Sequence, residues 1–181
     1  MSDKGKTILV GDSMVAYLNL NKYGLSNQVV NQGIAGDTTI GVLKRLKYVT
    51  GLNPSKVILS VGSNDMVLTN LSFEETIENI VKIKKEIEDQ TNTKVYVMSL
   101  TPVLRDSAIT NKYYVATRTN EDIKYINLKL QNAFKETEFI SIYEEFLDSK
   151  GNLDIQYTTD GIHLNHQGYE KYTHFIKNIL K

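Results

Sequence analysis

Two residues far apart in the sequence, Ser13 and His163, could together carry out nucleophilic catalysis. Ser13 lies just beyond an apolar run at residues 7–10, and His163 lies three residues after Asp160. A serine hydroxyl attacks a carbonyl at neutral pH only when an imidazole takes its proton, and a carboxylate must hold that imidazole in the correct tautomer. The sequence supplies all three residue types and therefore predicts a serine hydrolase.

The elements that must position these residues alternate between short apolar runs and amphipathic segments. Two of the runs, residues 57–61 and 95–98, barely alternate between apolar and polar positions, as in strands that are covered on both faces. Strand–helix alternation of this kind is typical of a parallel sheet with helices on both faces. We expect five strands, near residues 7–10, 28–31, 56–61, 94–100 and 139–142.

Capping residues indicate where the helices between these strands begin. Ser72 and Glu75 have the spacing of a capping box. Asn165 is the expected cap of the last helix, and Asp37 is the expected cap of a helix that Gly51 ends.

A polar cluster follows each predicted strand. Ligands of parallel sheets bind beyond the carboxyl ends of the strands, so these clusters are expected to meet at one rim. The clusters are residues 11–13, 31–37, 62–65, 99–102 and 160–163.

The clusters resemble the sequence blocks of the SGNH hydrolase superfamily, also called GDSL-type esterases and lipases. The blocks occur in family order, with Met14 where the family name has leucine. The matching residues are Gly11, Asp12, Ser13, Gly33, Gly62, Asn64, Asp65, Asp160 and His163. The resemblance implies a single domain over residues 1–181, with a three-layer α/β/α, flavodoxin-like fold around a central parallel five-stranded sheet. It also implies an acyl-ester hydrolase that uses no cofactor and no metal.

The resemblance implies a role for each reacting group. Ser13 is the expected nucleophile, His163 the base, and Asp160 the carboxylate that orients the imidazole. The expected oxyanion hole consists of the backbone N–H groups of Ser13 and Gly33 and the side chain of Asn64. Such donors act by pointing to where negative charge develops.

Asp12 and Asp65 are expected to support the site rather than to react. Asp12 is suited to accept backbone N–H bonds in its turn, and Asp65 to hold the loop of Asn64. Two structural alternatives stay open, because Ser13 also fits a helix N-cap and Asn64 an Asx-turn.

Other classes of function fit the sequence less well. A dinucleotide-binding domain would need G-x-G-x-x-G after the first strand, where only Gly11 is present. His163 and His166 have a spacing compatible with metal ligation, but no cysteine or acidic cluster completes a zinc shell. A metal-dependent phosphoesterase is the chemical rival, with a hard-metal ligand set of Asp12, Asn64, Asp65 and His163. A binding module without activity is the non-enzymatic rival.

Composition bounds the remaining possibilities. The 181 residues are 41% hydrophobic and 23% charged, as expected of one globular domain. Lys and Arg number 21, as do Asp and Glu, so no net charge favours nucleic acid or an anionic membrane. No run of 18 apolar residues and no apolar leader is present, which predicts a cytoplasmic protein without membrane insertion; a removed leader fits the same pattern. The sequence does not indicate an oligomeric state.

The long connection over residues 102–120 is the candidate substrate wall or lid, because it lies at the same rim. Arg105 and Arg118 are expected to form salt bridges or face solvent. The apolar side chains that would line the wall, or else cover the core, are Leu104, Ile109, Tyr113 and Tyr114. The expected partner is a small-molecule ester with a short acyl group such as acetyl. Lysophospholipids, thioesters of longer acyl chains and acetylated carbohydrates are the alternatives.

Overall fold

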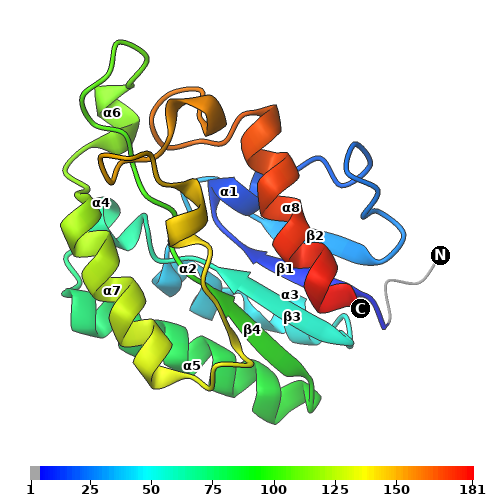
Figure 1. The fold of residues 1–181 in the computed structure, drawn as a ribbon. Coiled ribbons are helices and arrows are strands. Elements are labelled where there is room, and N and C mark those ends of the chain that lie inside the picture. Colours follow the sequence, from blue (N-terminus) through cyan, green and yellow to red (C-terminus); the bar gives the residue numbers. More distant parts are fainter. Residues whose placement is uncertain (1–4) are drawn as a thin grey trace.

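A five-stranded parallel sheet forms the centre of the protein (Figure 1). The structure, a computed structural model, describes residues 5–181. The strand order β2-β1-β3-β4-β5 confirms the predicted flavodoxin-like fold. The strands are β1 (Thr7–Gly11), β2 (Val29–Gly33), β3 (Lys56–Ser60), β4 (Lys94–Met98) and β5 (Phe139–Ile140). Gly11 is in register with Gly33 of β2 and with Ser60 of β3, so three neighbouring strands end side by side at the carboxyl edge.

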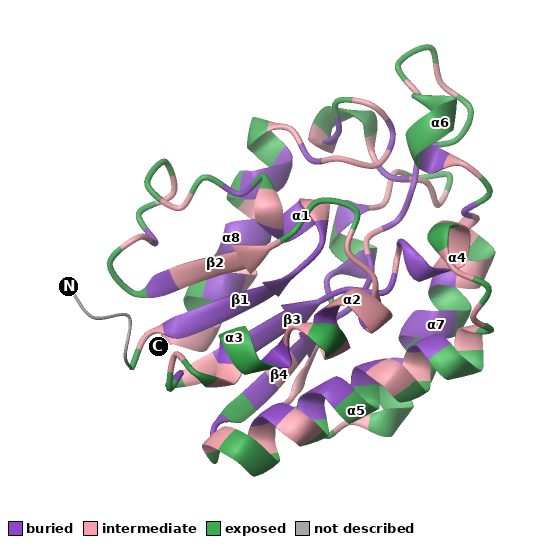
Figure 2. Cartoon of the chain, turned by 180° about the vertical axis from the view of Figure 1, so that it is seen from behind, coloured by how far each residue is buried: buried purple, intermediate pink, exposed green. Residues whose placement is uncertain are grey.

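Helices cover both faces of the sheet, as predicted, and form the outer layers (Figures 1 and 2). One face packs against α2 (Thr39–Lys44), α3 (Leu46–Thr50), α5 (Phe73–Thr91) and α7 (Asn120–Ala133). The other packs against α1 (Ser13–Ala16), α8 (His166–Leu180) and the 3₁₀ turn Tyr143–Phe146. The remaining short elements are α4 (Asp65–Leu68), α6 (Lys112–Val115) and the 3₁₀ turn Ile155–Tyr157. None of the helices within residues 5–181 has the length and hydropathy needed to cross a lipid bilayer.

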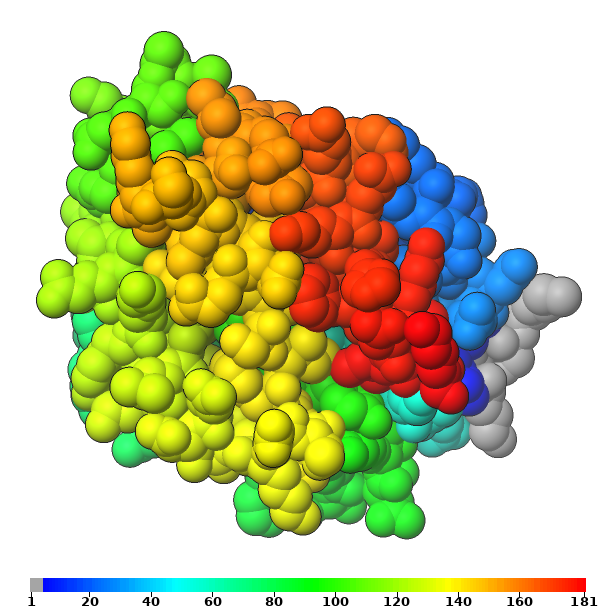
Figure 3. Space-filling model, viewed as in Figure 1, coloured from blue at the N-terminus to red at the C-terminus, as the bar shows by residue number. Residues whose placement is uncertain are grey.

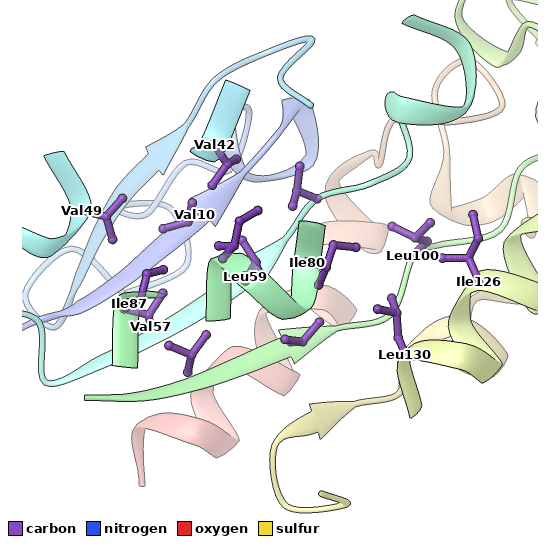
Figure 4. Close-up of a cluster of buried hydrophobic side chains, with 14 of the residues drawn as sticks. Val10, Val42, Val49, Val57, Leu59, Ile80, Ile87, Leu100, Ile126 and Leu130 are labelled. Atoms are coloured by element: carbon purple, nitrogen blue, oxygen red, sulfur yellow. The ribbon is translucent and has the colours of Figure 1, made fainter. Parts of the chain in front are cut away.

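Alternate side chains of the central strands enter opposite cores. Val57 and Leu59 of β3 lie with Ile80 of α5 in one core, whereas Ile58 lies in the other. Figure 4 shows the first of these clusters, in which side chains of α5 and α7 meet the sheet. These aliphatic groups are fully buried, and each contributes about 1.5–3 kcal/mol relative to an exposed side chain. The strands that end at the carboxyl edge are therefore held between two packed cores.

Two of the three predicted helix caps are confirmed. Ser72 and Glu75 form a reciprocal capping box at the start of α5, and Asn165 caps α8. The prediction for Asp37 is wrong, because Thr38 caps α2 by accepting the N–H of Gly41. The Asp37 carboxylate is instead engaged by the guanidinium of Arg45, 2.7 Å away, and by the N–H of Thr38.

The last helix closes one face of the molecule. In Figure 3, α8 lies between the segment that joins α1 to β2 and the segment that follows β5. Tyr172 and Ile176 of α8 are fully buried against the sheet. Because α8 begins at His166, its docking carries the residues just before it to the carboxyl edge of β1.

Candidate active site

Ser13, His163 and Asp160 form a continuous hydrogen-bonded chain at the carboxyl edge of the sheet. Ser13 Oγ lies 3.1 Å from Nε2 of His163, and Nδ1 of the same ring lies 2.7 Å from Oδ2 of Asp160. With Nδ1 donating to the carboxylate, Nε2 is free to accept the proton of the hydroxyl. The arrangement has the geometry of a nucleophile, its base and the group that orients the base.

Close packing fixes the turn between β1 and α1. A Cβ at Gly11 would lie 2.2 Å from the carbonyl oxygen of Ser60, so this approach of β1 to β3 requires glycine. Asp12 caps α1 by accepting the N–H of Met14 at 3.0 Å. From the opposite side, the buried hydroxyl of Tyr169 in α8 donates to the carbonyl of Met14 at 2.9 Å. The corner that carries the serine is therefore held by both a neighbouring strand and the last helix.

The loop before α8 holds Asp160 as an anion. Its carboxylate accepts the His163 ring N–H, the His163 backbone N–H at 2.8 Å and the Ile162 N–H at 3.1 Å. Burial alone would raise the pKa of Asp160, but these hydrogen bonds outweigh it and hold the pKa below its ordinary value. Gly161 turns this loop with a φ of +91°, and a Cβ there would meet the carbonyl oxygen of Leu104 at 2.4 Å.

The two predicted supporting acids, Asp12 and Asp65, are both buried. Asp65 accepts the N–H of Thr39 at 3.0 and 3.1 Å and its hydroxyl at 2.5 Å, which ties α4 to the start of α2. Asp12 accepts the N–H of Met14, and burial raises the pKa of the Asp12 carboxyl to about 6. Each acid thus holds a segment next to Ser13 or Asn64.

The expected oxyanion donor Gly33 does not fit that role. Its N–H donates to Oδ1 of Asn31 at 2.9 Å within β2, and a Cβ there would lie 2.3 Å from the backbone N of Ala16. Gly36, with a φ of +79°, lines the cavity over Ser13 instead. Among residues 5–181, no protein acceptor binds the N–H of Gly36 or of Ser13. These two N–H groups are free for a ligand.

Asn64 lines the same cavity and has a fixed carboxamide. Its Nδ2 donates to the carbonyl of Asp37 at 2.9 Å, and its Oδ1 accepts from Nη2 of Arg118 at 2.8 Å. An amide nitrogen carries two N–H bonds, so one is still available to a ligand. Arg118 was expected in a salt bridge or in solvent, yet it is 3% exposed and hydrogen-bonded to neutral groups.

A cavity of about 530 Å³ opens over Ser13 and His163. The rings of Tyr17 and Tyr114 lie 5.3 and 5.2 Å from the His163 ring, so the imidazole sits between two tyrosines. The cavity is lined by Ser13, Tyr17, Gly36, Asn64, Val67, Leu68, Lys112, Tyr113, Tyr114, Ala116, Arg118, Ile162 and His163.

Two of the four expected wall residues, Tyr113 and Tyr114, line this cavity, and the other two do not. Leu104 is buried in the core on the α8 side of the sheet, and its N–H donates to the carbonyl of Gly161 at 2.8 Å. Ile109 is 38% exposed, away from the cavity lining. Leu104 therefore supports the loop of Asp160 rather than facing a substrate.

A second, much smaller cavity of about 20 Å³ lies beside Ser13 and Asn64. Ile162 lines both cavities, and Met14 and Leu100 supply apolar walls to the small one. A space of this size accommodates one water-sized group.

The two histidines with ligand-like spacing have separate partners. The ring of His163 is used by Asp160 and Ser13, whereas Nδ1 of the exposed His166 lies 3.0 Å from the hydroxyl of Tyr23. Within the part of the chain that the structure describes, no three His, Asp or Glu side chains are grouped as metal ligands.

The sequence model of the GDSL-like Lipase/Acylhydrolase family matches residues 9–171. The chain belongs to this family. Lipases and acylhydrolases are carboxylic ester hydrolases, and the predicted superfamily is thereby confirmed. A GDSL-like lipase from Bacteroides thetaiotaomicron has the same fold, with a TM-score of 0.83 over 98% of this chain and 88% of its own, at 21% identity.

Curated relatives are similar to the chain over most of its length. An N-acylneuraminate cytidylyltransferase of Escherichia coli is 30% identical over 96% of this chain, and the chain spans 40% of that relative's length. The platelet-activating factor acetylhydrolase IB subunit alpha2 of Rattus norvegicus is 29% identical over 93% of the chain and 73% of its own length.

Sequence reasoning did not single out Gly36 or Arg118, which both line this cavity. Arg118 looked like a surface charge. Gly36 stands next to Asp37, three residues after Gly33, the predicted donor, and both glycines precede a helix. A signal existed for Gly36, because a glycine in a turn between strand and helix is suited to a positive φ.

Proposed function

We propose that this chain hydrolyses small esters of short acyl groups, acetyl in the first place, through an acyl-enzyme on Ser13. The observation that carries the proposal is the hydrogen-bonded chain Ser13–His163–Asp160 at the floor of an open cavity. Membership of the GDSL-like lipase/acylhydrolase family supports the same reaction class.

In the proposed reaction, Ser13 Oγ bonds to the ester carbonyl carbon while its proton passes to Nε2 of His163. Asp160, held ionised by its N–H donors, stabilises the imidazolium that forms. The tetrahedral intermediate collapses, the C–O bond to the alcohol breaks, and the alcohol takes the proton from His163. A water molecule then attacks the acyl group with His163 as base, and the carboxylic acid and free Ser13 are released.

The proposed oxyanion hole consists of the N–H groups of Ser13 and Gly36 and the free N–H of the Asn64 amide. The first two have no protein acceptor among residues 5–181, and Asn64 lies on the same cavity. Preorganised donors of this kind need no rearrangement when the negative charge develops.

The size of the small cavity beside Ser13 supports the proposal that the preferred acyl group is acetyl. Its volume of about 20 Å³ admits a methyl group but no longer chain without displacing Met14, Leu100 or Ile162. The alcohol part would then occupy the larger cavity between Tyr17, Tyr113 and Tyr114. The names of two relatives, an acetylhydrolase and an N-acylneuraminate enzyme, support an acetyl ester and make a sugar alcohol part worth testing.

Turnover of p-nitrophenyl esters tests both the reaction and the acyl preference. We expect kcat/KM to fall about 10-fold or more from acetyl to butyryl, because each added methylene meets the wall of the small cavity. Ile162→Ala should reduce this discrimination by enlarging the cavity. Rates that rise past octanoyl would contradict the short-acyl proposal. Acetylated N-acylneuraminate and acetylated xylo-oligosaccharides then test the alcohol part.

Covalent labelling tests the nucleophile. A fluorophosphonate should add one adduct, located on Ser13 by peptide mass analysis, and Ser13→Ala should abolish it together with turnover. Ser55→Ala, at an exposed serine near the opposite edge of the sheet, is the matched control and should label normally. Turnover that disappears in excess EDTA, with no adduct on Ser13, would favour the metal-dependent alternative.

A further inference from the structure

Arg118 is a buried arginine that takes no direct part in the proposed reaction. It is 3% exposed, although it lies in the connection between β4 and α7. Within residues 5–181, no carboxylate lies within ion-pair distance of its guanidinium. Burying a charge without a counterion is costly, and the cost is reduced only when hydrogen-bond acceptors surround the charge.

The acceptors around this guanidinium are neutral groups from two parts of the active-site rim. Nε donates to the carbonyl and hydroxyl oxygens of Ser63 at 3.0 and 2.9 Å. Nη1 donates to the carbonyl of Tyr114 at 2.7 Å and of Val115 at 3.3 Å. Nη2 donates to Oδ1 of Asn64 at 2.8 Å. Arg118 thus joins α6, which carries the tyrosine wall, to the segment that carries Asn64.

The contact with Arg118 decides which way the Asn64 amide faces. A guanidinium has donors only, so the amide atom opposite it must be the oxygen. The amide nitrogen then faces the carbonyl of Asp37, which can only accept. A charged donor on the amide oxygen also draws electron density from the nitrogen, which makes its remaining N–H a stronger donor.

We propose that Arg118 is a positioning residue of the oxyanion hole, which orients and polarises the Asn64 carboxamide through the Nη2–Oδ1 hydrogen bond. The inference rests on the proposed function, because it assigns Arg118 a task only if Asn64 stabilises the oxyanion. Arg118 acts through Asn64, so its removal lowers kcat and leaves KM nearly unchanged.

A double-mutant cycle on purified protein tests this task. Asn64→Ala should lower kcat for p-nitrophenyl acetate by about 10²–10³-fold, the effect of losing one oxyanion donor. Arg118→Met keeps the length of the side chain but has no donor, and should lower kcat by about 10²-fold, as expected of a small misplacement of a catalytic group. In the Asn64→Ala background, Arg118→Met should change kcat by no more than about 2-fold.

Arg105→Met is the matched control for a structural role. Arg105 donates to the carbonyls of Ala116 and Arg118, so it holds the same connection without touching Asn64. The kcat of Arg105→Met should stay near that of the wild type. Arg118→Lys keeps the charge, so its kcat should lie between that of Arg118→Met and that of the wild type. Thermal unfolding of each variant verifies that it is folded.

The outcomes separate the two proposals. If Asn64→Ala keeps the wild-type kcat, the oxyanion role in the proposed function is wrong. If Asn64→Ala lowers kcat but Arg118→Met costs the same factor in both backgrounds, only the positioning role is overturned. Equal losses in Arg105→Met and Arg118→Met would likewise assign Arg118 to the fold alone.

Discussion

Two loops at the same edge of the sheet each place an aspartate beside a catalytic candidate, and the pKa values of the two aspartates are shifted in opposite directions. Asp12 precedes Ser13 in the β1–α1 corner, is fully enclosed, and accepts the N–H of Met14. Asp160 lies in the loop before α8 and accepts three N–H bonds, two of them from His163. Burial therefore decides the pKa of the first, and hydrogen bonding decides that of the second.

The comparison shows that position next to a candidate catalytic residue does not define the pKa of a carboxylate. Asp160 accepts three N–H bonds that hold its pKa below the ordinary value, whereas burial raises the pKa of Asp12 to about 6, so between about pH 4 and 6 Asp160 is ionised while Asp12 is mostly protonated. Asp12 accepts the backbone N–H of Met14 and so stabilises the β1–α1 corner. The predictions below test this division, from the largest expected effect to the smallest.

Asp160→Asn should give the largest loss. We expect kcat to fall by about 10⁴-fold, because an amide presents an N–H to Nδ1 and favours the wrong tautomer of His163. Asp154→Asn is the matched control, since Asp154 lies in the same region and its carboxylate, within residues 5–181, accepts only from Gln156. Steady-state kinetics with p-nitrophenyl acetate measures both. A retained kcat in Asp160→Asn would reassign the carboxylate.

Gly36 and Gly33 allow a similar comparison, between a proposed oxyanion donor and a glycine that close packing requires. Gly36→Ala meets no atom within 4 Å but must adopt a positive φ, so we expect kcat to fall by about 10²-fold, with a loss of stability of about 1–2 kcal/mol. Gly33→Ala would place a Cβ 2.3 Å from a backbone nitrogen, which should cost about 3 kcal/mol of stability or more. Kinetics and chemical unfolding distinguish them. A folded Gly33→Ala with kcat reduced as in Gly36→Ala would return the donor role to Gly33.

Asp12→Asn should have the smallest effect on turnover and a distinct effect on stability. In the wild type, the folded state holds the Asp12 proton up to a pH of about 6, whereas the unfolded chain releases it near 3.8. The Asp12 contribution to the unfolding free energy therefore falls as pH rises from about 4 to 6, by on the order of 3 kcal/mol, and is constant above. An asparagine at position 12 can still accept the N–H of Met14 but does not titrate. The variant therefore lacks this loss of stability between pH 4 and 6.

Urea unfolding of both proteins from pH 4 to 7 measures that difference. The stability of Asp12→Asn relative to the wild type should increase from pH 4 to 6, and its kcat should stay within about 10-fold. Asp160 contributes in the opposite direction, because its lowered pKa makes stability fall as pH drops below about 4. An unchanged difference across this range would mean that Asp12 is already ionised at pH 4.

Much of the fold was predictable because strand patterns and caps are local. The runs around residues 57–61 and 95–98 could be recognised from their apolar composition, and Ser72 and Asn165 from their spacing to the helix. The cap of α2 was not, because Asp37 and Thr38 both suit that position. An ion pair with Arg45, eight residues further on, decides it.

The site was predictable where its residues follow strands and not where they come from the long connection. Ser13, Asn64 and Asp160 end or follow regular elements, so the parallel sheet brings them together. Leu104 and Arg118 are placed by partners 57 and 54 residues away in sequence, Gly161 and Asn64. No local pattern encodes such contacts.

The hydrogen bond between Ser13 and His163 joins positions 150 residues apart, and this has a consequence for the protein during synthesis. A ribosome releases the chain from its amino terminus, so Ser13 emerges long before His163, its proposed base. Until α8 docks against the β1–α1 corner through Tyr169, the nascent chain carries an ordinary, unreactive hydroxyl. If Ser13 and His163 act as proposed, esterase activity therefore requires that α8 has docked, and incomplete nascent chains are inactive.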